Sequence, residues 1–168
     1  MKLRFCSQRG VTFVELMITV VIIGIVSAMA APRFQRIWER VKVRASDREM
    51  VSTLRLARSK AITDKEQYGV YFDQANRSVT LFKDLANPSA MTFEGGDSVI
   101  RVDTLPTEFT YMGTDMINNV LVFLPNGSAG FTGGGNVFSL AVTPQMVAII
   151  IHNVLASTGR VHSYSSIY

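Results

Sequence analysis

The sequence predicts an α+β protein in which a long N-terminal helix packs on a head of mainly antiparallel β-sheet. Three observations support this fold class. Residues 11–31 form an apolar run, residues 33–66 continue a helical pattern without proline or glycine, and residues 67–168 change to the two-residue alternation and β-branched or aromatic composition of strands. A helix that covers one face of an antiparallel sheet is a common α+β arrangement.

Residues 1–10 form a short, polar and basic leader. Lys2, Arg4 and Arg9 belong to the chain's 17 Lys and Arg residues, and Cys6 is its single cysteine. Without the leader, 14 basic side chains would face 13 acidic ones, so the net charge of +4 is mostly a property of the leader. A single cysteine also excludes an internal disulfide.

The run from Val11 to Ala31 is long enough to cross a membrane. At about 1.5 Å per residue it spans about 30 Å, which is the thickness of a bilayer core. The basic residues before the run are expected to remain in the cytoplasm, which places residues 32–168 on the other side. The alternative is a secretory signal peptide that is cleaved at Ala28-Met29-Ala30, which would release a periplasmic protein.

Glu15 is the single charged residue of this run. A carboxylate near the centre of a membrane helix costs roughly 2.5–3.5 kcal/mol on insertion scales, and less near an end, so an acid here is a functional candidate. A disposable export signal has no use for it. Glu15 therefore favours a helix that is retained.

Residues 32–66 predict an amphipathic stem that continues the same helix, with a kink where Pro32 removes a backbone hydrogen bond. The stem carries ten Lys or Arg residues and five acids, whereas residues 67–168 carry four and seven. The stem is therefore basic and the head mildly acidic. Apolar residues recur mostly every three or four positions, with a break between Ala45 and Val51, and comprise Phe34, Ile37, Val41, Ala45, Val51, Leu54, Ala57 and Ala61.

The head, residues 67–168, contains a series of strand candidates separated by turn residues. The first two flank residues 73–77 and predict a hairpin. The glycine-rich stretch 130–135 lacks the Gly-Lys-Ser/Thr ending of a phosphate loop and precedes a strand, so we expect a flexible turn or surface loop. The strand candidates are residues 68–72, 78–82, 99–102, 109–112, 120–124, 137–142, 146–154 and 160–164.

The sequence favours neither an enzyme nor a metal or cofactor site. Residues 11–168 contain no cysteine and two histidines, and no serine or aspartate lies in a recognisable catalytic motif. His152 and His162 are separated by a stretch without an acidic or thiol ligand. His152 lies in an apolar run and is expected to be a packed strand residue.

The stretch Gly10-Val11-Thr12-Phe13-Val14-Glu15-Leu16, followed by the apolar run, resembles the class III signal of type IV pilins and type II secretion pseudopilins. The resemblance implies cleavage between Gly10 and Val11 by a prepilin peptidase and N-methylation of Val11, although the family usually has phenylalanine or methionine there. It also implies that Glu15 docks against the N-terminal amine of a neighbouring subunit. Pro32 matches a common pilin position.

Residues 54–61, 122–128 and 157–162 are similar to the GspH/FimT family of minor pilins and pseudopilins. This resemblance implies the pilin fold and a structural subunit near the tip of a type II secretion pseudopilus, without a cofactor. The subunit would be a single-pass inner-membrane protein with its head in the periplasm. Its expected partners are the prepilin peptidase, other pilins or pseudopilins, and the inner membrane.

A FimT-like minor pilin, involved in type IV pilus assembly or DNA uptake, is the alternative. Some FimT-like proteins are implicated in DNA uptake through a C-terminal Gly-Arg-x-Arg motif, which here reads Gly159-Arg160-Val161-His162. Histidine in place of the second arginine offers about half the cationic charge for phosphate contacts. Arg160 and His162 are thus candidate contacts for nucleic acid or another partner, with nucleic acid the less favoured.

Overall fold

The structure, a computed structural model, describes residues 10–144 and 146–168. The other leader residues, among them Lys2, Arg4, Cys6 and Arg9, and the predicted turn residue Gln145 lie outside the described residues. The chain divides into two units, residues 1–37 and residues 38–168, and helix α1 (Phe13–Asp64) contributes to both. The second unit contains the whole β-sheet head.

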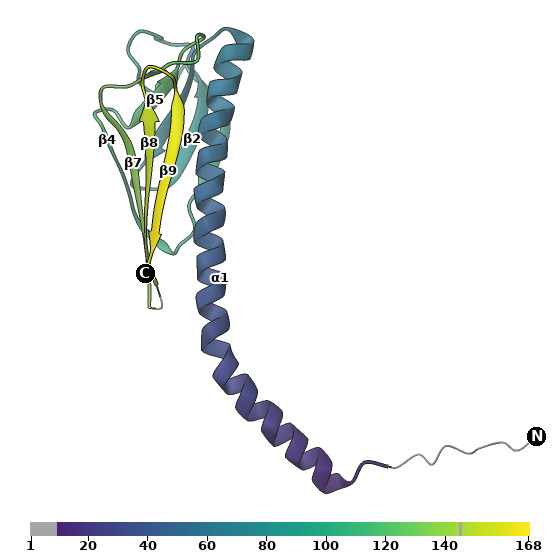
Figure 1. The fold of residues 1–168 in the computed structure, drawn as a ribbon. Coiled ribbons are helices and arrows are strands. Elements are labelled where there is room, and N and C mark those ends of the chain that lie inside the picture. Colours follow the sequence, from purple (N-terminus) through teal and green to yellow (C-terminus); the bar gives the residue numbers. More distant parts are fainter. Residues whose placement is uncertain (1–9, 145) are drawn as a thin grey trace, which may run out of the picture. The chain divides into compact units, whose positions relative to one another are not determined.

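The strands of the head form two antiparallel sheets (Figure 1). The five-stranded sheet has the order β3-β2-β1-β5-β6 and the four-stranded sheet the order β4-β7-β8-β9. The predicted α+β class is confirmed, and a strand forms at each predicted position. The strands are β1 (Tyr68–Asp73), β2 (Ser78–Lys83), β3 (Ser98–Thr104), β4 (Phe109–Met116), β5 (Val120–Phe123), β6 (Ala129–Gly130), β7 (Gly133–Thr143), β8 (Met146–Leu155) and β9 (Arg160–Ile167).

The predicted hairpin is the β1–β2 pair, in which Tyr68 lies opposite Lys83 and Asp73 opposite Ser78. Its turn is held by Asp73, whose Oδ1 accepts the backbone N–H groups of Ala75 and Asn76 at 3.0 Å each. Hydrogen bonds from the backbone and side chain of Asn76 hold the pKa of Asp73 below its ordinary value. The turn therefore follows from local side-chain chemistry.

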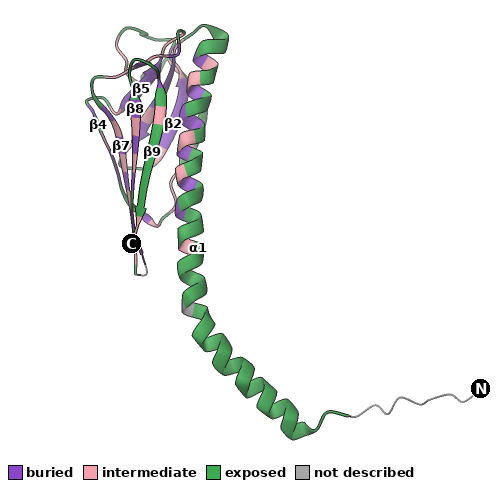
Figure 2. Cartoon of the chain, viewed as in Figure 1, coloured by how far each residue is buried: buried purple, intermediate pink, exposed green. Residues whose placement is uncertain are grey.

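The helical stem packs on the head through residues spaced three and four apart (Figure 2). The predicted positions Leu54, Ala57 and Ala61 are fully buried. Val41 and Ala45, which the periodicity also placed on this face, are exposed. In this part of α1 the buried positions are instead Val43, Ser46, Met50 and Thr53.

Two satisfied hydroxyl groups explain the error in the predicted face. Ser46 Oγ donates to the Lys42 carbonyl at 3.2 Å, and Thr53 Oγ1 donates to Asp103 Oδ2 at 2.8 Å. A buried hydroxyl is tolerated when it is hydrogen-bonded, so polar residues can occupy the packed face. The apolar pattern therefore pointed to the wrong residues in this segment.

The core of the head lies between α1 and the two sheets. Its largest cluster joins Leu54, Ala57 and Ala61 of the helix to apolar residues of both sheets, including Phe72 and Phe123. The side chains of Ala57 and Ala61 are small, so large side chains of the sheets can pack directly against this face of the helix. Burial of a Leu or Phe side chain stabilises a fold by about 1.5–3 kcal/mol. This packing fixes residues 54–61 of the stem against the head, while the opposite side of the stem stays exposed.

The glycine-rich stretch is partly strand, which corrects the predicted flexible turn. Strand β7 begins at Gly133, where φ is 110° and an added Cβ would lie 2.5 Å from the Asp115 carbonyl oxygen. Asp115 also accepts hydrogen bonds from the backbone and side chain of Asn136 at 2.8 and 2.6 Å. Glycine is needed here because β4 approaches closely and the backbone is left-handed.

Asp84 is a buried carboxyl group directly after β2. Neither oxygen has a hydrogen bond, although the backbone N–H of Asn87 is near enough to act on the group. Burial, with the negative charges of Asp97 and Glu94, raises its pKa above the ordinary 3.8. The folded chain therefore binds more protons than the unfolded chain between pH 3.8 and the raised pKa, and its unfolding free energy falls as the pH rises through that window.

We expect Asp84→Asn to remove this loss of stability. Denaturant unfolding of the full chain in a non-ionic detergent, followed by near-UV circular dichroism of the buried aromatic residues of the head between pH 4 and 7, measures the effect. The variant should gain about 1 kcal/mol at pH 7 relative to the parent, because the cost of burying a charge is absent. Equal pH profiles for the Asp84 variant and the parent would contradict the account.

Candidate functional site

The first candidate site is the exposed apolar segment at the start of α1. Its most apolar 18-residue window has a mean hydropathy of 2.4, and none of that window is buried. Phe13, Leu16 and Ile22 are 77%, 55% and 54% exposed. Apolar area in water costs about 25 cal/mol per Å², so a segment of this kind requires cover from lipid or from other protein chains.

Thr12 caps the N-terminus of this helix. Its Oγ1 accepts the backbone N–H of Glu15 at 3.2 Å, and its carbonyl accepts the N–H of Leu16 at 3.1 Å. The sequence Thr-x-x-Glu is the pattern of a capping box, and an acid in the first turn is favourable beside the positive end of the helix dipole. This capping signal is present in the sequence, but the interpretation of Glu15 as an intramembrane acid did not take it into account. Thr12 already satisfies one N–H group without needing a carboxylate.

Gly10 and Val11 lie before the helix, outside regular secondary structure. Val11 is 71% exposed, and a Cβ added to Gly10 would meet nothing within 4 Å. The peptide bond between them is therefore accessible, and a side chain at position 10 would not disturb the described chain.

The second candidate site lies where three parts of the stem and head meet around Arg58. Its Nε donates to the Gly127 carbonyl at 2.9 Å, which ties α1 to the turn between β5 and β6. An added Cβ at Gly159 would lie 2.3 Å from that same carbonyl oxygen and 3.0 Å from Arg58 Nε. The three stretches that resemble the GspH/FimT family thus meet at one contact, and much of their residue pattern serves packing.

Arg160 and His162 follow this contact on β9 and are both exposed. Their registers, opposite Leu155 and Asn153 of β8, place them on the outer face of the four-stranded sheet. With Arg55 and Arg58 they line one shallow hollow at the surface. The predicted pair is therefore brought together with two arginines of the stem. Arg58 is engaged with the Gly127 carbonyl, which leaves Arg55 and Arg160 as the exposed cations of the hollow.

Two protein families match most of the chain. The family described as "Prokaryotic N-terminal methylation motif" matches residues 6–31, and the family described as "Type II transport protein GspH" matches residues 48–154. The chain belongs to the GspH family.

Among solved structures, the chain is similar to the minor pseudopilin EpsH from the type 2 secretion system of Vibrio cholerae. The match has 16% sequence identity and a TM-score of 0.50, and it covers 72% of this chain and 94% of that one. At this identity the similarity establishes the fold. No curated protein matches the chain.

The two histidines of this GspH-family chain face opposite ways. His152 is 1% exposed on the inner face of β8, as expected for a packed strand residue, and its Nε2 lies 3.7 Å from Asp47 Oδ1. Burial lowers the pKa of His152 below its ordinary 6.5, and the charge of Asp47 offsets part of that effect. His162 stands on the outer face of the next strand, so the structure does not bring the two imidazoles together.

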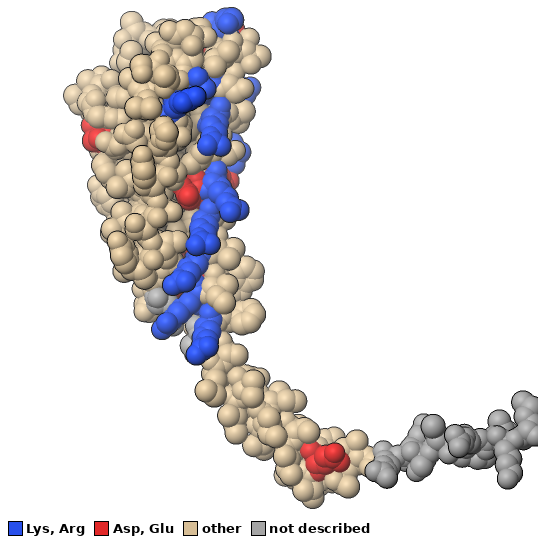
Figure 3. All heavy atoms as spheres, in the orientation of Figure 1, with Lys and Arg blue, Asp and Glu red and all other residues tan. Residues whose placement is uncertain are grey.

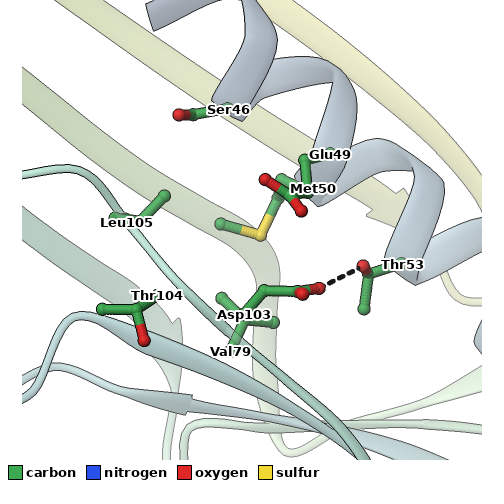
Figure 4. A pocket seen from close by; sticks show the side chains of 8 residues that line it. All are labelled: Ser46, Glu49, Met50, Thr53, Val79, Asp103, Thr104 and Leu105. Carbon is green, nitrogen blue, oxygen red and sulfur yellow. Dashed lines mark hydrogen bonds between the residues drawn. The ribbon is translucent and has the colours of Figure 1, made fainter. Parts of the chain in front are cut away.

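A small cavity lies between α1 and the β2–β3 side of the head (Figure 4). Its volume is about 10 Å³, enough for at most one water molecule. Thr53 and Asp103 on its wall are hydrogen-bonded to each other. Among residues 10–144 and 146–168, no three His, Cys, Asp or Glu side chains are grouped to hold a metal ion.

We expect Gly159→Ala to destabilise the head of the GspH-family chain by about 2–3 kcal/mol. The position has φ of 60°, and the methyl group would collide with the Gly127 carbonyl oxygen. Denaturant unfolding of the full chain in detergent measures this change. Gly95→Ala is the matched control, because a Cβ there meets nothing within 4 Å. Equal stability of the two variants would contradict the proposed packing role.

Proposed function

We propose that the chain is a minor pseudopilin, a structural subunit of a type II secretion pseudopilus that assembles through its N-terminal helix. The observation that carries the proposal is the combination of an uncovered apolar helix, a match to the N-terminal methylation motif, and a GspH-family head. The helix is too apolar to remain exposed to water. Helices of neighbouring subunits and the inner membrane offer the two environments that cover it.

In this proposal the chain crosses the inner membrane once, with the head in the periplasm. The basic leader stays in the cytoplasm, and residues 11–31 form the membrane and polymerisation helix. Residues 32–66 form the stem and residues 67–168 the head. A prepilin peptidase on the cytoplasmic side would reach the accessible bond between Gly10 and Val11.

Cleavage would create a new amino group at Val11, which is then N-methylated. Glu15 of one subunit would accept the Val11 ammonium of its neighbour, because a carboxylate in an apolar surrounding is stabilised by an opposite charge. Helix capping explains why an acid is tolerated here but does not require one, since Thr12 already accepts the Glu15 N–H at 3.2 Å. A cationic partner outside the chain gives the charge a role beyond its favourable interaction with the helix dipole.

The tip position and the non-enzymatic role rest on the family resemblance of the head. A FimT-like minor pilin that binds DNA is the second candidate, and the hollow of Arg55, Arg160 and His162 is the observation that favours it. The match of residues 48–154 to a type II transport family supports the secretion role more strongly.

Mass spectrometry of the mature N-terminus tests the proposal. We expect the first residue to be methylated Val11 in cells that contain a prepilin peptidase. Gly10→Val should accumulate uncleaved chain, and since a Cβ at position 10 has open space, the loss cannot be assigned to misfolding. A chain that begins at Ala31 would instead identify a secretory signal peptide and overturn the filament proposal.

A further inference from the structure

Four arginines form a row along the exposed side of the stem, and we call them the arginine stripe: Arg40, Arg44, Arg48 and Arg55. At about 100° per residue they fall within an arc of about 80° on α1, away from the buried positions such as Met50. At about 1.5 Å per residue the row extends for about 22 Å. Figure 3 shows the row of basic side chains along the helix beside the head.

The arginine stripe has no carboxylate partner among the described residues. The ion pairs of the stem are made by other positions, with Lys42 bound to Glu108 at 2.6 Å and Glu49 bound to Arg101 at 2.8 Å. Arg40, Arg44 and Arg48 are instead spaced four apart, so like charges are neighbours on the helix surface and repel each other. The arrangement destabilises the isolated helix. An anionic surface that lies against the stripe would offset this repulsion.

The carboxylates of residues 38–168 make contacts of their own, away from the stripe. In residues 38–168, every Asp and Glu except buried Asp84 already accepts a hydrogen bond or ion pair within the chain. Asp47, the acid nearest in sequence to Arg48, accepts the Ser163 hydroxyl at 2.6 Å. The acids of the stem, Glu39, Asp47, Glu49, Asp64 and Glu66, include no pair spaced three or four residues apart. The stem of a second copy therefore has no row of carboxylates that matches the stripe, so a different molecule must supply that row.

Two shallow hollows border the stripe. One is lined by Asp47, Arg48, Val51, Ser52 and Arg55, and Arg55 also borders the second hollow, which reaches Arg160 on β9. The small side chains of Val51 and Ser52 leave room between the guanidinium groups. Guanidinium groups bind carboxylates in a bidentate, planar arrangement.

We infer that the arginine stripe binds a row of carboxylates on an α-helix of a different filament subunit. The identity of the partner as a filament subunit rests on the proposed function. The stripe lies on the stem that follows the polymerisation helix, and two stems that run side by side present helix to helix. Acids spaced four residues apart on the partner would match the spacing of the arginines.

Nucleic acid fits this surface less well. The two aromatic residues of the stem, Phe34 and Trp38, both precede the stripe, so no aromatic side chain of the stem is interleaved with its arginines. The head is acidic, with seven acids and four Lys or Arg residues in 67–168. Long-range repulsion would oppose a polyanion that extends beyond the stripe. A short acidic helix avoids that repulsion.

Binding of three probes to the detergent-solubilised full chain tests the inference. The probes are a helical peptide with glutamates four residues apart on one face, a scrambled peptide of the same composition, and a DNA duplex of equal charge. We expect the striped peptide to bind most tightly and its affinity to fall with salt. Arg48→Glu should weaken it at least about tenfold, because an attraction becomes a repulsion.

Lys65→Glu is the matched control, since it makes the same change of charge at an exposed position outside the stripe, and it should weaken binding less than about twofold. Arg48→Glu places an acid four residues after Arg44, which favours the helix, so lost binding is not lost folding. Equal affinity for the two peptides, tighter binding of DNA, equal effects of the two variants, or no binding would each overturn the inference. None of these outcomes depends on leader cleavage, so the proposed function is tested separately.

Discussion

Within residues 10–144 and 146–168, no part of the chain buries the apolar half of α1, and this exposed segment is the constraint on which the rest of the account depends. A segment of that hydropathy needs a second environment, and the capped N-terminus and accessible Gly10–Val11 bond place a defined chemical end on it. Thr12 fixes where the helix begins. Glu15 then stands in the first turn, where the helix dipole favours an acid but an apolar surrounding does not. A cation supplied by a neighbouring chain, as proposed above, would resolve this conflict.

The head packs against one face of the stem and leaves the opposite face exposed to solvent. Small alanines let the helix approach the two sheets, and Arg58 ties it to the turn at Gly127. The close approach of Gly159 completes that contact. These residues explain why short stretches far apart in the sequence share one family pattern. They also leave the arginine stripe facing outward, where it can act only between molecules.

Much of this architecture follows from the sequence because its signals are local. The change from helical to two-residue periodicity located the strands, and Asp73 with Asn76 marked the first hairpin. The order of the strands in two sheets depends on contacts between distant residues, which periodicity does not encode. The buried face of the stem was misassigned near Ser46 and Thr53, because their hydroxyl groups find partners only in the folded chain. The sequence alone indicated a loop at Gly133, because the close approach of Asp115, which requires glycine in this strand, arises only in the folded chain.

The site was predictable to a similar degree. Gly10, Val11 and Glu15 were identified from one contiguous motif, and their roles remain predictions. Thr12 was missed although its spacing to Glu15 is a capping signal. Arg160 and His162 were found as a motif, but their association with Arg55 required the fold.

The most direct test of the central claim compares Glu15→Gln with Thr12→Ala in the full chain, expressed with the other subunits of its secretion system. The fraction of chain recovered in sheared filaments is measured against the amount in the inner membrane. The account predicts that Glu15→Gln lowers incorporation at least about tenfold at an unchanged membrane level, because the carboxylate that receives a neighbour's amine is gone. Thr12→Ala, which removes only the cap, should have the smaller effect. Normal incorporation of the Glu15→Gln chain would contradict the account.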